Sequence, residues 1–203
     1  MKTVFFITII LIINQLNATI ETKDCVKLFY NGLENEHFED IVESKKMLLE
    51  ILIDKDYSLN DFLILLHIEL FLDNWETFYD TALKGIEKFN NTSEVGLIYQ
   101  AIGTYAIVTG RPNYKEYLEE AISEMLKEPY EAHSITNLPQ CYFLLDKKDE
   151  AILYIEKVKK NSKIKYDLSA FEYFSKKIFI SKLKQDRLIV QNMKKKHNQK
   201  NSN

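Results

Sequence analysis

The stretch from Glu94 to Tyr130 constrains the fold more than any other part of the chain. It has the pattern of two amphipathic helices joined by a tight break, Thr109-Gly110-Arg111-Pro112-Asn113. Apolar residues recur at close to helical spacing on both sides of the break: Leu97, Ile98, Ala101, Ile102, Tyr105 and Ile107 before it, and Tyr114, Tyr117, Leu118, Ala121, Ile122, Met125 and Leu126 after it. Pro129 ends the second helix, because proline cannot continue one. One such hairpin leaves apolar surface uncovered, so it needs similar hairpins beside it.

Similar breaks occur on either side of this hairpin. Asn74-Trp75, Asn113-Tyr114 and Lys148-Asp149 each open a second helix, at spacings of about 39 and 35 residues. Periods of this length are typical of tetratricopeptide and HEAT-type arrays. Glycine (5) and proline (3) are scarce in the 203 residues, which favours helices throughout. The sequence therefore predicts an all-α fold, a tetratricopeptide-like α-solenoid of antiparallel helix pairs over residues 20–190.

The apolar periodicity also places the individual helices. They are expected at residues 21–30, 37–53, 62–72, 75–89, on both sides of the central break, and at 132–145, 149–160 and 168–190. Residues 62–72 are apolar nearly all round, which predicts a buried centre, with Asn60 or Asp61 as the N-cap. Asn31-Gly32 is expected to end the first helix. Pro139 is expected to bend its helix or to delay its start.

Residues 1–19 have the form of a secretory signal peptide or membrane-targeting segment. Lys2 precedes an apolar run from Val4 to Ile13, which is too short to span a bilayer. A short apolar first helix, or a start upstream of the real one, fits the same residues. If the chain enters the secretory lumen, Asn90-Asn91-Thr92 and Asn91-Thr92-Ser93 are glycosylation sequons.

The C-terminal end is basic, whereas the rest of the chain is acidic. Nine Lys or Arg residues follow position 175 against one acid, Asp186, so this end carries +8 of a total charge of −3. Residues 191–203 are rich in Lys, Asn and Gln and are expected to be a disordered tail. The tail can be a solvated end, touch anionic lipid headgroups, or bind nucleic acid electrostatically. No nucleic-acid partner is expected, because the aromatic residues follow the helical core stripes instead of lying among the basic residues.

The sequence contains no pattern that indicates catalysis. None of the four histidines, His37, His67, His133 and His197, lies in an HExxH motif or beside a CxxC pair, so no metal ligand is expected. His67 is expected to be satisfied by a partner or to lie at the rim of the core. Cys25 and Cys141 are expected to be small buried hydrophobes and not reactive thiols. We therefore expect no catalytic, cofactor-binding or metal-binding residue, and no enzymatic activity.

The repeats resemble one family within the tetratricopeptide superfamily, subunit 2 of the endoplasmic-reticulum membrane protein complex. The similarity begins at Ile41-Val42-Glu43 and continues to Phe89-Asn90-Asn91-Thr92-Ser93-Glu94-Val95. The hairpin with Asn113-Tyr114 and Pro129 also matches the family's layout, as does Lys148-Asp149-Glu150-Ala151-Ile152. The epsilon subunit of the vesicle coatomer is a weaker rival, whose hairpin spacing after the central pair is shorter.

The resemblance implies a non-enzymatic scaffold, without cofactors, that lies at the endoplasmic-reticulum membrane as a peripheral protein. There it would brace the membrane subunits of a complex that inserts tail-anchored and multi-spanning proteins. Two alternatives remain open. One is a secreted helical-repeat protein that binds a partner outside the cell, and the other is a vesicle-coat subunit.

Overall fold

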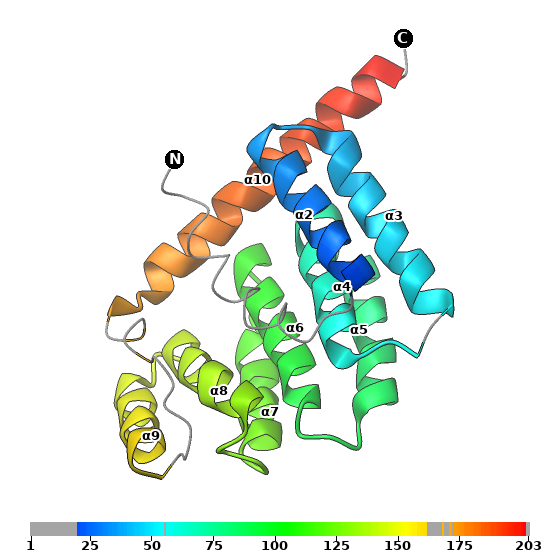
Figure 1. Cartoon of the computed structure of the whole chain (residues 1–203). Coiled ribbons are helices and arrows are strands. Elements are labelled where there is room, and N and C mark those ends of the chain that lie inside the picture. The colour runs from blue at the N-terminus through cyan, green and yellow to red at the C-terminus, as the bar shows by residue number, and fades with distance from the viewer. Residues whose placement is uncertain (1–19, 55, 162–167, 169–170, 172, 202–203) are drawn as a thin grey trace. The chain divides into compact units, whose positions relative to one another are not determined.

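The computed structural model describes residues 20–54, 56–161, 168, 171 and 173–201, and in this part of the chain it contains nine α-helices and no strand (Figure 1). The predicted all-α class is therefore confirmed. The signal-like segment, residues 1–19, lies outside the described residues. The described residues divide into two compact units, those of 20–81 with 183–201, and those of 82–182. Helices α5 (Trp75–Phe89) and α10 (Lys176–Asn201) each contribute to both units.

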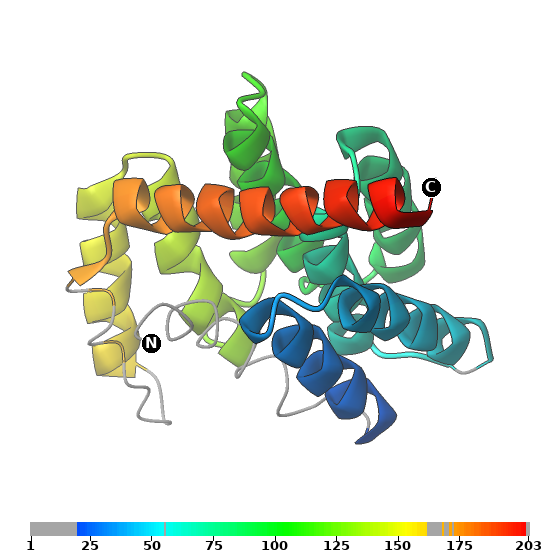
Figure 2. The same cartoon turned by 90° about the horizontal axis from the view of Figure 1, so that it is seen from above.

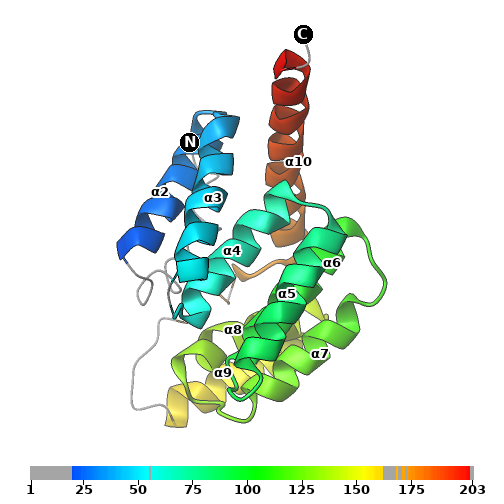
Figure 3. The same ribbon diagram turned by 90° about the vertical axis from the view of Figure 1, so that its right-hand side faces the viewer.

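The first unit is built on a helical hairpin, α2 (Ile20–Glu34) and α3 (Phe38–Asp54), which packs on α4 (Leu59–Leu72; Figure 3). Helix α2 does not end at Asn31-Gly32 as predicted. A Cβ atom on Gly32 would lie 2.7 Å from Cγ1 of Ile41 and 2.9 Å from the carbonyl oxygen of His37. This glycine therefore serves the close approach of α2 and α3 within an unbroken helix.

Helix α4 is the buried centre of the first unit, as its composition predicts. Its side chains are buried on nearly every side, and Leu66 is only 1% exposed. The predicted N-cap, Asn60 or Asp61, is wrong, because the helix begins at Leu59. Ser58 caps it by accepting a hydrogen bond from the Asp61 N–H, and the Asp61 side chain accepts one from the Ser58 N–H. This capping box brings the start of the helix forward by three residues.

The second unit contains the central hairpin and the one after it. Helix α6 (Val95–Thr109) packs on α7 (Tyr114–Met125), α7 on α8 (Ala132–Leu144), and α8 on α9 (Lys148–Asn161). Gly110 ends α6 in the left-handed conformation (φ 75°), with its N–H donating to carbonyl groups of the last turn. The break predicted from Thr109 to Asn113 is thus a glycine C-cap. Pro139 lies inside α8 and does not delay its start, so of the two predicted effects only a bend in the helix stays a prediction.

The largest difference from the sequence prediction is at the C-terminus. The last α-helix was expected at residues 168–190, followed by a disordered tail from 191 to 203. Instead α10 begins at Lys176 and continues without a break to Asn201 (Figure 2). The apolar spacing of Leu183, Val190 and Met193 continues past the predicted end, and all three side chains are buried. The basic residues of the tail therefore belong to a helix with a packed inner face.

The close approach of α6 and α7 leads to a stability prediction. A Cβ atom on Gly96 would lie 2.8 Å from Cγ of Met125 and 2.9 Å from the carbonyl oxygen of Ala121, which cannot rotate away. Overpacking lowers the free energy of unfolding by about 1–3 kcal/mol, and the higher helix propensity of alanine offsets at most about 1 kcal/mol of this loss. We expect Gly96→Ala to lower the free energy of unfolding by about 1–2 kcal/mol in urea denaturation. Ser123→Ala, at an exposed site of α7, should cause no loss. A Gly96→Ala protein as stable as the parent would contradict this packing.

Candidate functional site

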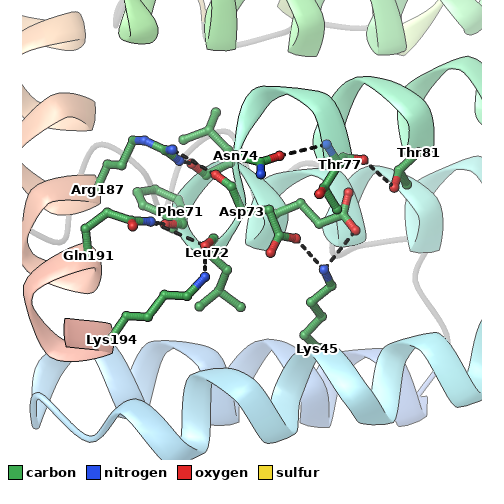
Figure 4. Close-up of polar contacts among 12 residues, drawn as sticks. Lys45, Phe71, Leu72, Asp73, Asn74, Thr77, Thr81, Arg187, Gln191 and Lys194 are labelled. Atoms are coloured by element: carbon green, nitrogen blue, oxygen red, sulfur yellow. Dashed lines mark hydrogen bonds and ion pairs between the residues drawn. The ribbon is translucent and has the colours of Figure 1, made fainter. Parts of the chain in front are cut away.

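The C-terminal half of α10 is fixed to the end of α4 by side-chain hydrogen bonds (Figure 4). Three α10 side chains donate to carbonyl oxygens at the end of α4: Arg187 to Leu70 and, at 2.8 Å, to Asp73; Gln191 to Phe71 at 2.6 Å; and Lys194 to Leu72 at 3.1 Å. The last carbonyl groups of an α-helix have no partner within the helix, and its C-terminus favours positive charge. These contacts therefore satisfy the end of α4 and fix the rotation of α10 about its axis.

A buried ion cluster holds the same end of α4 to α3. The Lys45 ammonium lies 3.1 Å from a carboxylate oxygen of Glu69 and donates to the carboxylate of Asp73 (Figure 4). Burial raises the pKa of Glu69, although the charge of Lys45 opposes it. For Lys45, burial lowers the pKa, but the hydrogen bond to Asp73 and the nearby negative charges outweigh it and leave the pKa raised. Lys45 pairs with both carboxylates within the fold, which gives the cluster a structural role.

A second contact fixes the end of α10 to the first turn of α3. Nδ1 of His197 lies 2.9 Å from a carboxylate oxygen of Glu39, and the His197 ring lies 5.3 Å from the ring of Phe38, centroid to centroid. A hydrogen bond with its own backbone, and then the one with His197, lower the pKa of Glu39. The segment from Arg187 to His197 is therefore attached to α4 at one end and to α3 at the other.

The opposite side of this segment is exposed and defines the candidate site. We call Lys184, Leu188, Ile189, Lys195 and Lys196 the outer face of α10. Lys184, Leu188 and Lys195 are spaced by four and seven residues and therefore form one stripe along the helix. Ile189 and Lys196 are seven residues apart and form a second stripe on the same side. Leu188 is 60% exposed and Ile189 37%, and all three lysines are exposed. The only acid in α10, Asp186, is half-buried and lies on the inner side.

A separate hollow of about 590 Å³ opens in the second unit between the α5–α6 turn and the α7–α8 turn. In it, the buried Ser93 hydroxyl donates to the carboxylate of Glu128, and Nε2 of His133 lies 3.0 Å from the hydroxyl oxygen of Ser93. Burial lowers the pKa of His133, so the ring is neutral at pH 7. A hydroxyl group can donate only one hydrogen bond, and the Ser93 hydroxyl donates it to the Glu128 carboxylate. His133 must then donate its Nε2 proton to Ser93, which is the reverse of the geometry that activates a nucleophile.

The remaining residues named from the sequence do not assemble into one site. Cys25 and Cys141 are both buried, as predicted, and burial raises the pKa of the Cys141 thiol. His37 is exposed at the start of α3, 2.8 Å from a carboxylate oxygen of Asp40. Among the described residues, no group of three or more His, Cys, Asp or Glu side chains is placed to hold a metal ion.

His67 is partly exposed, in agreement with the predicted position at the rim of the core. Its ring packs against the rings of Phe29 and Phe71, with centroid distances of 6.1 and 5.1 Å, and its buried Nε2 atom has no hydrogen-bond partner. Without a partner, burial lowers the pKa of His67 to about 4. The folded state therefore holds this ring neutral well below the pH at which it would be protonated in water.

This burial gives a pH prediction. The pKa of histidine in an unfolded chain is about 6.5, so between pH 6.5 and 4 the unfolded state takes up a proton that the folded state does not. The contribution of His67 to stability should fall across this window by about 3 kcal/mol and should change no further below pH 4. Urea denaturation at pH 7 and pH 4 should show this loss in the parent protein and a smaller one in His67→Leu. His37→Leu, at an exposed ring, is the control. An equal loss in parent and His67→Leu would contradict the burial.

Comparison of the chain with models of protein families, with curated proteins and with solved structures gave no match. Within the described residues, no helix is both long enough and apolar enough to cross a membrane.

The residues that fix α10 were not identified from the sequence. Arg187, Gln191 and Lys194 fall in a stretch whose composition suggested a solvated tail. The signal that could have found them is the apolar spacing of Leu183, Val190 and Met193, which continues the helical period beyond residue 190. That α4 would supply their acceptors follows only from the tertiary structure.

Proposed function

We propose that this protein is a non-enzymatic helical-repeat scaffold that holds other proteins of a membrane-associated complex. The observation that supports it most is the packing of the second unit, in which α6 and α7, and then α8 and α9, form consecutive helix pairs that pack neighbour on neighbour. Proteins built in this way expose long continuous surfaces suited to binding partners. The resemblance to subunit 2 of the endoplasmic-reticulum membrane protein complex names the kind of assembly, with the chain as a peripheral subunit at that membrane.

Affinity purification of the tagged chain from its own cells, followed by native mass spectrometry, tests this proposal. A scaffold should co-purify with membrane proteins in fixed stoichiometry and remain with them through a second purification step. A chain recovered as a monomer, without stoichiometric partners, would contradict the proposal. Recovery with the subunits of a vesicle coat would instead support the coatomer-like alternative.

One observation favours the secreted alternative. Asn90 and Asn91, the acceptor residues of the two overlapping sequons, are exposed in the turn after α5, where a glycosylating enzyme can reach them. A secreted protein should be protected from protease inside microsomes and should shift in mass when Asn90 and Asn91 are both changed to Gln. A cytosolic scaffold should be digested without detergent and should carry no glycan.

A further inference from the structure

The outer face of α10 combines positive charge with exposed aliphatic side chains. Its charges are all positive, because the lysines at 184, 195 and 196 have no acid among them. It also carries two exposed aliphatic side chains, Leu188 and Ile189, which lie between the lysines along the axis, with the exposed polar residues Gln185 and Asn192 beside them. Lys184 and Lys195 are separated by about 16 Å along the helix, at 1.5 Å per residue. The face is therefore a short amphipathic surface with positive charge at both ends.

We infer that the outer face of α10 binds the surface of an anionic phospholipid membrane. The lysines would lie among the headgroup phosphates, and Leu188 and Ile189 would enter the boundary between headgroups and acyl chains. Amphipathic helices that lie in this boundary also combine apolar side chains with lysine or arginine. The inference rests on the proposed function in that it places the scaffold at a membrane, and it names the lipid as a partner.

The structure favours a membrane over other acidic partners for two reasons. Contacts with the phosphates of a nucleic acid would not bury the exposed side chains of Leu188 and Ile189. The one arginine of α10, Arg187, already donates hydrogen bonds to carbonyl groups at the end of α4. A protein groove would have to enclose a helix, whereas one side of α10 is already occupied by its own fold through the buried Val190 and Met193. Only the outer face of α10 is left for a partner, and a one-sided contact of this kind suits the flat surface of a membrane, whose lipids can rearrange around the side chains.

The contacts on the inner side make this face rigid before binding. Arg187, Gln191 and Lys194 fix the rotation of α10 on α4 (Figure 4), and His197 fixes its end on α3. The lysines of the outer face and those of the inner face therefore differ in role. Lys194 donates a hydrogen bond to the carbonyl oxygen of Leu72, whereas Lys195 and Lys196 are exposed to solvent.

Co-sedimentation of the full chain with phosphatidylcholine vesicles, with and without phosphatidylserine, tests the inference. The parent protein should bind the vesicles that contain phosphatidylserine more tightly. Changing Lys184, Lys195 and Lys196 together to Gln should weaken that binding about a hundredfold, at about fivefold for each lysine. Raising the salt from about 0.1 M to about 1 M should have a similar effect, because it shortens the screening length from about 10 Å to about 3 Å.

Two further variants separate this inference from simple charge attraction. Leu188→Ser with Ile189→Ser leaves the charge intact and should weaken binding about tenfold, because the aliphatic contact is lost. Changing Lys157, Lys159 and Lys160 to Gln removes the same charge from the exposed side of α9 and should leave binding unchanged. All these side chains are exposed, so thermal melts should show that each variant remains folded.

Three results would overturn the inference. They are absence of any preference for phosphatidylserine, equal losses from the α10 and α9 lysine variants, and tighter binding to an RNA homopolymer that is insensitive to the serine variants. Because the vesicles contain no other protein, failure here is distinct from failure to co-purify with a membrane complex. A scaffold that keeps its protein partners but ignores lipid would retain the proposed function and lose this inference.

Discussion

Leu66→Asp should leave the protein unfolded under conditions in which the parent is fully folded. Leu66 is 1% exposed at the centre of α4, a helix whose side chains are buried on nearly all sides. The change removes a buried aliphatic side chain, at about 2–5 kcal/mol, and introduces a carboxyl group that costs several kcal/mol even when it is protonated. The sum is comparable with the total stability of a domain, about 5–15 kcal/mol.

Circular dichroism and urea denaturation measure this effect. Leu153→Asp is the matched control, because Leu153 is 52% exposed in the middle of α9 and the same substitution there should cost about 1 kcal/mol or less. A Leu66→Asp protein with the melting temperature of the parent would show that α4 is not the centre of the first unit.

Deletion of residues 191–203 should destabilise the first unit by about 3–5 kcal/mol. Burial of Met193 contributes about 1.5–3 kcal/mol, and the hydrogen bonds from Gln191 and Lys194 to the end of α4 contribute about 1 kcal/mol each. A disordered tail, as the composition of this segment suggested, would instead leave the melting temperature unchanged. Thermal and urea denaturation of the truncated chain distinguish these two outcomes.

Point substitutions locate the effect within the segment. Gln191→Ala should lower the free energy of unfolding by about 1 kcal/mol, because it leaves the carbonyl group of Phe71 without its side-chain donor. Lys194→Ala should cost less, because Gln191 also donates to the carbonyl oxygen of Leu72, at 3.3 Å. Lys195→Gln and Lys196→Gln, on the exposed side, should leave stability unchanged. If the deletion had no effect, the contacts drawn in Figure 4 would contribute nothing to folding.

The sequence by itself determined the helical class and most helix positions, because both depend on local signals. The bounds of α5, Trp75 and Phe89, coincide with those predicted, and the break after Thr109 is the glycine cap that its residues indicate. The apolar composition of residues 62–72 also identified the buried helix. A period of 3.6 residues, a proline or a left-handed glycine acts within one or two turns and can be recognised without knowledge of the rest of the chain.

Tertiary structure decided the features that depend on distant partners. Gly32 lies inside a helix because Ile41 and His37 approach it, and the Nε2 atom of His67 is buried because Phe29 and Phe71 pack against its ring. Arg187 binds the carbonyl group of Leu70, which lies 117 positions earlier in the chain. No local pattern specifies such a pair. The outer face of α10 could therefore be recognised only once the structure had shown which side of that helix packs against the fold and which side remains exposed.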